Sequence, residues 1–177
     1  MTNPVNKRFV GGGLRLAAGA AAPLRLDHQY FEHDLRPLLG ALLLEKGLVT
    51  HADLDAALEQ SRLTGMRLGE TLLARGLLFE PELAAALAEQ SGLRYVDLVR
   101  HPLDPCAARL LPLEVARRMF TVPVRFLEAD RLEVAVADPA DVDVEVLERI
   151  LGRRVDLVVG ERSAIQDAWR YSPHGAA

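Results

Sequence analysis

The chain has 177 residues, of which 50% are hydrophobic and 26% are charged. This composition is typical of a soluble globular protein, and the length suits one ordinary domain or two small ones. The formal net charge of −4 argues against any general attraction to nucleic acid or to an anionic membrane surface. No run of about eighteen apolar residues suggests a membrane-spanning helix, so we expect no direct membrane insertion.

The sequence offers few residues for metal or redox chemistry. Cys106 is the single cysteine, which excludes an internal disulfide and a multi-cysteine metal site. His28 and His33 lie near Glu32, but their spacing is too loose for a metal site. We therefore interpret the histidines as surface residues and expect no metal and no cofactor.

The first 26 residues are rich in alanine and glycine and carry basic but no acidic side chains. Such a segment buries little area per ordered residue, so we expect residues 1–26 to form a flexible basic arm. Lys7 and Arg8 precede a stretch that faintly resembles a secretory signal, but Arg15 interrupts its apolar part. A cytoplasmic location is the better prediction, with recruitment to the inner membrane by a partner as a further hypothesis.

A short amphipathic helix is expected to follow the arm. Tyr30, Phe31, Leu35 and Leu38 fall close to helical spacing. We interpret their apolar face as packing on its own domain, and the docking of a partner protein is the alternative.

The segment from Leu38 to Gln90 contains a tandem repeat. Leu38–Ser61 superposes on Arg67–Gln90 at an offset of 29 residues (67 − 38 = 29). The identical pairs are Leu39/Leu68, Gly40/Gly69, Leu43/Leu72, Leu44/Leu73, Gly47/Gly76, Leu48/Leu77, Leu54/Leu83, Ala56/Ala85, Ala57/Ala86 and Leu58/Leu87. A fixed offset of this kind marks a duplicated structural unit.

The first repeat is expected to fold as two helices joined by a glycine turn. Leu38–Lys46 forms a short apolar helix that ends at Gly47, because glycine adopts the left-handed conformation without a Cβ penalty. Thr50 then caps the second helix, and Asp53 three residues later completes an approximate capping box.

The second repeat copies this plan. Gly76 makes the turn, and Pro81 stands in the first turn of the second helix, where its missing N–H costs nothing. The repeat ends at Gly92. Residues 27–92 are therefore expected to form a helical subdomain of four short helices.

The residues after Gly92 follow a different pattern. Asp104-Pro105 starts a helix, or a pair of short helices, that runs to about Met119. Alternating apolar residues at 122–126 and 132–136 predict a β-hairpin.

The pattern continues with a helix over Val142–Leu151, a strand over Arg154–Val159 and a last helix capped by Ser163. A sheet covered by helices should result over residues 93–172, followed by a short disordered tail at 173–177. The expected fold class is α+β, with a helical tandem-repeat subdomain before a small α/β sheet subdomain.

Three features of the repeats exceed what a helical core requires. Consecutive leucines make the first helix of each repeat apolar around more of its circumference than one core face needs. Gly40 and Gly69 lie in first helical turns, where glycine costs helix stability but lets another group approach the backbone. Arg67 and Gln90 bracket the second repeat with long hydrogen-bonding side chains.

These residues resemble the MshEN domain, which is the N-terminal domain of type II secretion and type IV pilus assembly ATPases. The second repeat, Arg67–Gln90, fits the family's 24-residue motif at every defining position, and the spacer Arg62–Met66 also fits. The stretch Leu132–Pro139, which ends in Val-Ala-Asp-Pro, and Tyr171 are similar to the family's C-terminal part.

The resemblance implies binding of the bacterial second messenger cyclic di-GMP, held mainly through apolar contacts by the paired motifs. A purine offers flat apolar faces to leucine side chains, and its O6/N7 edge suits a bidentate arginine. The candidate ligand-binding residues are Arg36, Leu38, Leu39, Gly40, Leu43, Leu44, Gly47, Leu48, Leu54, Leu58, Arg67, Leu68, Gly69, Leu72, Leu73, Gly76, Leu77, Leu83, Leu87, Gln90 and Asp138.

The first repeat departs from the motif at its polar ends. Leu38 and Ser61 stand where Arg67 and Gln90 stand in the second repeat, and Gln60 comes one position early. Half of the expected polar contacts are therefore missing.

Arg36 precedes the first repeat by two residues and could reach the same region. Asp138 could pair with an arginine or accept a hydrogen bond from a guanine amine. The alternative for each is an ordinary surface or capping residue.

The sequence lacks the phosphate loop G-x-x-x-x-G-K-[ST] that the full assembly ATPases need, so we expect no enzyme activity. The predicted function is a non-catalytic regulatory module that binds cyclic di-GMP and has a protein partner in a secretion, pilus or envelope-polysaccharide system. DNA and RNA are not expected partners. The alternative is a protein-docking adaptor of the same fold, with a degenerate first motif and no nucleotide binding. A third and much weaker interpretation is an unrelated helical repeat domain.

Overall fold

The structure is a computed structural model that describes residues 38–128 and 130–171. The predicted basic arm, the predicted helix before Leu38, the predicted tail and Arg36 lie outside the described residues.

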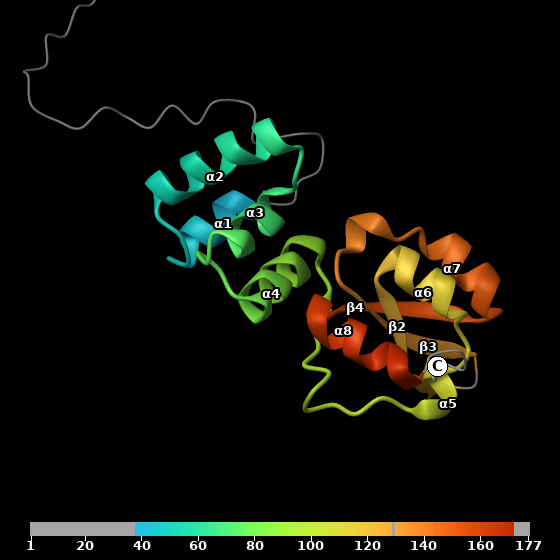
Figure 1. Cartoon of the computed structure of the whole chain (residues 1–177). Helices are drawn as coiled ribbons and strands as arrows, with labels where there is room; N and C mark the ends of the chain where they lie inside the picture. The colour runs from blue at the N-terminus through green and yellow to red at the C-terminus, as the bar shows by residue number, and fades with distance from the viewer. Residues whose placement is uncertain (1–37, 129, 172–177) are drawn as a thin grey trace, which may run out of the picture. The chain divides into compact units, whose positions relative to one another are not determined.

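The tandem repeat forms four short helices, as predicted (Figure 1). Their bounds are α1 Leu39–Glu45, α2 His51–Thr64, α3 Leu68–Ala74 and α4 Glu80–Ser91. Gly47 and Gly76 occupy equivalent turns with φ of 65° and 67°, in the left-handed region that favours glycine. At the start of α2 the Thr50 hydroxyl accepts a hydrogen bond from the Asp53 amide at 3.1 Å, so the predicted cap is confirmed.

Equivalent leucines of the two repeats build one common core. Leu43 in α1 and Leu72 in α3 are both fully buried, and Leu54 from α2 packs with them. Short helices of this length are marginal alone, so their mutual packing is what stabilises them.

The remainder of the described chain alternates helices and strands. The bounds are β1 Arg94–Tyr95, α5 Pro105–Ala108, α6 Leu113–Met119, β2 Thr121–Glu128, β3 Arg131–Val136, the 3₁₀ helix η2 Pro139–Asp141, α7 Val144–Leu151, β4 Arg154–Val159, α8 Arg162–Ala168 and the 3₁₀ helix η3 Trp169–Tyr171.

The strands make one mixed sheet in the order β1-β4-β3-β2. β2 and β3 pair as the predicted antiparallel hairpin, whereas β3 pairs with β4, and β4 with β1, in parallel. β3 lies inside the sheet, and Leu132, Val134 and Val136 in it are fully buried. The α+β fold class is confirmed.

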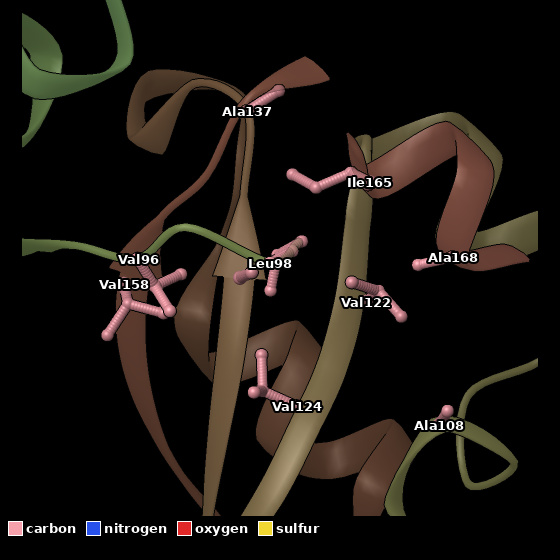
Figure 2. Close-up of a cluster of buried hydrophobic side chains, with 10 residues drawn as sticks. Val96, Leu98, Ala108, Val122, Val124, Ala137, Val158, Ile165 and Ala168 are labelled. Atoms are coloured by element: carbon pink, nitrogen blue, oxygen red, sulfur yellow. The ribbon is translucent and has the colours of Figure 1, made fainter. Parts of the chain in front are cut away.

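Helices cover both faces of the sheet. Figure 2 shows Val122, Val124 and Val158 pointing from the strands toward a cluster completed by Ile165 and Ala168 of α8. On the opposite face, α6 and α7 pack through Ala116 and Leu147 among others. The first of these clusters fixes the position of α8, which starts beside the candidate site.

Two details of the prediction are wrong. Ser163 does not cap the last helix: Glu161 precedes α8 as its N-cap, and the Ser163 hydroxyl instead donates to a carboxylate oxygen of Glu80 at 2.7 Å. The helix α7 begins at Val144 rather than Val142, because Asp143 accepts hydrogen bonds from the first helical amides.

None of the helices in the described ranges combines the length and apolarity needed to cross a lipid bilayer.

Candidate functional site

A cavity of about 390 Å³ lies beside α3, and we call it the α3 cavity. It is lined by residues of the second repeat together with residues near η2 and the start of α8. The lining residues are Leu39, Arg67, Leu68, Gly69, Glu70, Leu73, Glu80, Leu83, Ala84, Leu87, Gln90, Ala137, Asp138, Ala140, Gly160 and Arg162.

Leucine side chains form the apolar wall of the cavity. Leu73 comes from α3, and Leu83 and Leu87 come from one face of α4. Gly69 lies buried against this wall, and a Cβ built on it would stand 2.8 Å from Leu83 Cδ1. The group that approaches the Gly69 backbone is therefore a leucine of the same repeat.

Arg67 stands at the N-terminus of α3 and is half exposed. Its Nη1 donates to Asp138 Oδ2 at 2.6 Å and to Asp141 Oδ2 at 2.9 Å, and its Nη2 also donates to Asp141. The pKa of Arg67 is raised, chiefly by the hydrogen bond to Asp141, and desolvation partly offsets this effect. Two carboxylates therefore hold this guanidinium in place.

The turn η2 presents both carboxylates. Asp138 caps the turn, because its Oδ1 accepts a hydrogen bond from the Ala140 amide at 2.9 Å. The second oxygen, Oδ2, remains oriented toward Arg67. Asp138 therefore both caps η2 and pairs with an arginine, which are two of the roles the sequence left open.

A second guanidinium, that of Arg162, lines the same cavity. Its Cζ atom lies 3.7 Å from the centre of the Phe120 ring, and its Nη2 lies 3.5 Å from Glu70 Oε1. The other oxygen of Glu70 accepts from the Arg67 backbone amide at 3.4 Å. Glu70 thus stands between the two arginines.

Polar contacts hold the start of α8 beside the cavity. Glu80 accepts hydrogen bonds from the amide and hydroxyl of Ser163, at 2.9 and 2.7 Å. The Tyr95 hydroxyl donates to Glu161 at 2.6 Å. Burial, followed by this hydrogen bond, raises the pKa of Tyr95 well above its ordinary value.

The structure brings only some of the candidate residues together. Leu39, Arg67, Leu68, Gly69, Leu73, Leu83, Leu87, Gln90 and Asp138 line the α3 cavity. Candidates that do not line it are Leu38, Gly40, Leu43, Leu44, Gly47, Leu48, Leu54, Leu58, Leu72, Gly76 and Leu77. Several of these, such as Leu43 and Leu72, belong to the helical core instead.

Sequence reasoning missed Glu70, Asp141 and Arg162. Glu70 lies inside the second repeat, at a position where the first repeat has Ala41. Because the two repeats differ at this position, their alignment did not indicate a role for Glu70. Asp141 and Arg162 are far from the motif in the chain, and only the fold brings them to Arg67 and Glu70.

The α3 cavity combines an apolar wall with a few charged groups at its edge, as small-molecule sites usually do. Leucines suit the faces of a flat ring, and guanidinium and carboxylate groups suit its hydrogen-bonding edge. Within residues 38–128 and 130–171, no group of three or more histidine, cysteine, aspartate or glutamate side chains is placed to hold a metal ion.

Comparisons with known proteins find a family model and several relatives of this chain. The family model described as the MshEN domain matches residues 91–176. The chain is 37% identical over 138 residues to bacteriophage adsorption protein B of Escherichia coli (strain K12), covering 77% of this chain and 18% of that protein. It is 41% identical over 136 residues to the type IV pilus assembly ATPase PilB of Thermus thermophilus, covering 76% of this chain and 15% of that protein. The chain therefore spans less than a fifth of the length of these relatives.

A solved structure described as "Structure of MshE with cdg" is similar over nearly its whole length. The match has 37% identity and a TM-score of 0.66, and it covers 77% of this chain and 99% of that chain.

Proposed function

Because this chain belongs to the MshEN domain family, we propose that it is a non-catalytic regulatory module that binds cyclic di-GMP. The similar solved structure contains MshE with cdg, which we take to abbreviate cyclic di-GMP. The match covers 99% of the MshE chain. Nearly every segment of that chain, including any that contacts the ligand, therefore has an equivalent segment in this one.

The observation that carries the proposal is the position of Arg67 and Asp138 at the edge of the leucine wall. A guanine placed against Leu73, Leu83 and Leu87 would present its edge to these two side chains. The arginine can donate to O6 and N7, and the carboxylate can accept from the ring N–H and the amine.

Arg67 must exchange partners to bind in this way. Its guanidinium is paired with Asp138 and Asp141 in the structure. A guanine that replaces Asp141 as the partner of Arg67 would leave that guanidinium in contact with Asp138. Binding then involves a change in the ion pairs between α3 and η2.

We propose that the second repeat supplies most of the contacts. Leu39 is the one first-repeat residue among the described lining residues of the α3 cavity. This distribution agrees with the sequence, because the polar ends of the motif are present only in the second repeat.

The proposed setting is a secretion, pilus or envelope-polysaccharide system, in which a protein partner receives the signal. Two kinds of relative support it, a type IV pilus assembly ATPase and a bacteriophage adsorption protein. The proposed non-catalytic role is supported by the sequence, in which the phosphate loop of the assembly ATPases is not found.

Calorimetric titration of the chain with cyclic di-GMP tests the proposal. We expect micromolar or tighter binding, which Arg67→Ala weakens by about tenfold or more, since a hydrogen bond to a charged group contributes about 1.5–3 kcal/mol. Arg75→Ala is the matched control, because Arg75 ends the same helix but does not line the cavity. Absence of heat at high ligand concentration would contradict the proposal.

A protein-docking adaptor of the same fold is the second candidate function. Two observations favour it. Arg67 is already paired with Asp138 and Asp141, and the first repeat contributes only Leu39 to the described lining of the α3 cavity. On this alternative the chain gives no heat with cyclic di-GMP, and Arg67→Ala leaves partner capture in a pull-down unchanged.

A further inference from the structure

The α3 cavity contains a guanidinium that lies outside both repeats. In the first repeat Leu38 stands where the second has Arg67, so the duplicated motif supplies one arginine instead of two. Arg162, at the start of α8, brings a second arginine into the same cavity.

The surroundings of Arg162 hold its side chain in one orientation. Its guanidinium lies over the Phe120 ring, with Cζ 3.7 Å from the ring centre, and the side chain is 35% exposed. The Phe120 ring in turn contacts Trp169, at 5.5 Å between ring centres. A guanidinium stacked on an aromatic ring keeps its N–H donors pointing outward in its own plane.

The two arginines of the cavity differ in how many carboxylates they contact. Arg67 donates to two carboxylates, with a 2.6 Å contact to Asp138 and a chelating contact to Asp141. Arg162 has a single ion pair among the described residues, to Glu70 at 3.5 Å. Arg162 therefore has fewer and longer carboxylate contacts than Arg67, and an anionic group could replace its one partner, Glu70, more easily than the two partners of Arg67.

We propose that Arg162 binds a phosphodiester group of cyclic di-GMP and so supplies a second arginine contact, which the repeats do not provide. This assignment depends on the proposed function. A phosphodiester accepts strong, charge-assisted hydrogen bonds from a guanidinium, and the contact can be bidentate. Arg67 and Asp138 then serve the guanine edge, and Arg162 serves the backbone of the same ligand.

The test is a calorimetric titration of the full chain with cyclic di-GMP at several NaCl concentrations. Arg162→Gln is expected to weaken binding by about tenfold or more, as loss of a charge-assisted hydrogen bond should. It is also expected to reduce the dependence of Kd on salt, because one direct charge contact is lost.

Two further variants separate a direct contact from other effects. Arg109→Gln removes the same charge from an exposed position that does not line the cavity, and it is expected to bind like wild type. Arg162→Lys keeps the charge and is expected to keep the wild-type salt dependence, with weaker binding because an ammonium cannot make the bidentate contact.

Several results would overturn the assignment. One is a Kd of Arg162→Gln within about twofold of the wild-type Kd. Another is weak binding by Arg162→Gln with the same dependence of Kd on salt as the wild type. A lysine variant whose salt dependence matches that of the glutamine variant would also overturn it. Absence of wild-type binding would reject the proposed function itself, and this assignment with it.

Discussion

At the scale of single residues, the two repeats are less alike than their sequences. Gly40 and Gly69 are equivalent in the repeat, and each is approached by an equivalent leucine. A Cβ on Gly40 would lie 3.2 Å from Leu54, whereas a Cβ on Gly69 would lie 2.8 Å from Leu83. The second repeat is therefore packed more tightly at this point.

This difference predicts the order of two alanine substitutions. Alanine gains about 0.5–1 kcal/mol over glycine in a helix, but overpacking costs about 1–3 kcal/mol. We expect Gly69→Ala to destabilise the protein by about 1 kcal/mol and Gly40→Ala to be close to neutral. Urea unfolding curves of the two variants measure this, and equal or reversed free energies of unfolding would contradict it.

The residues of the candidate site could be predicted from sequence where they belong to the motif or, for Asp138, to the stretch Leu132–Pro139 that is similar to the family's C-terminal part. Arg67 and Gln90 stand out because they are long hydrogen-bonding side chains at the two ends of the second repeat. Asp141 and Arg162 have no such signal, since an aspartate two residues after a proline and an arginine in a helix are ordinary surface residues. Their role depends on long-range packing that a local pattern does not contain.

At the scale of elements, β1 connects the sheet to the start of α8. Tyr95 in β1 donates to Glu161, which directly precedes Arg162. Burial and this hydrogen bond favour the protonated phenol, so the pKa of Tyr95 is raised above 10.0 in the folded state. The two elements thus share one partly buried polar contact.

The raised pKa of Tyr95 predicts how stability depends on pH. Below about pH 10 the phenol is protonated in both the folded and unfolded states, so its contribution to stability is complete. As pH rises through 10 toward the folded-state pKa, the unfolded state loses its proton first and the free energy of unfolding falls.

Tyr95→Phe removes this dependence. The variant is expected to be about 1 kcal/mol less stable at pH 7 because it lacks the hydrogen bond to Glu161. Its disadvantage should shrink above pH 10, since only the wild type has this phenol to titrate. Thermal unfolding followed between pH 7 and 11 measures the difference, and a constant gap would contradict the assignment.

Most elements could be predicted because their signals are local. The repeat helices end at left-handed glycines, and the hairpin follows from alternating apolar residues. β1 could not be predicted, because its two residues form a strand only by pairing with Val158 and Val159 of β4. The prediction that Ser163 caps the last helix was wrong, because the Ser163 hydroxyl donates a hydrogen bond to Glu80 of α4 instead.

At the scale of the molecule, the candidate site depends on both the helical repeat and the sheet segments that follow it. The repeat supplies the leucine wall and Arg67, and the segments around β3 and β4 supply Asp138 and Arg162. α4 packs directly on β4, where Ala84 and Ala88 meet Val159. The sequence division at residue 92 stays a prediction, and the contacts across it are what complete the α3 cavity.

A map of backbone amide NMR shifts during titration of the full chain with cyclic di-GMP tests whether the α3 cavity binds this ligand. We predict saturable shifts at Gly69, Leu83, Asp138 and Arg162, and none at Phe126 in the β2–β3 hairpin. Unchanged amide shifts at saturating ligand, or shifts confined to residues outside the α3 cavity, would show that cyclic di-GMP does not bind in this cavity.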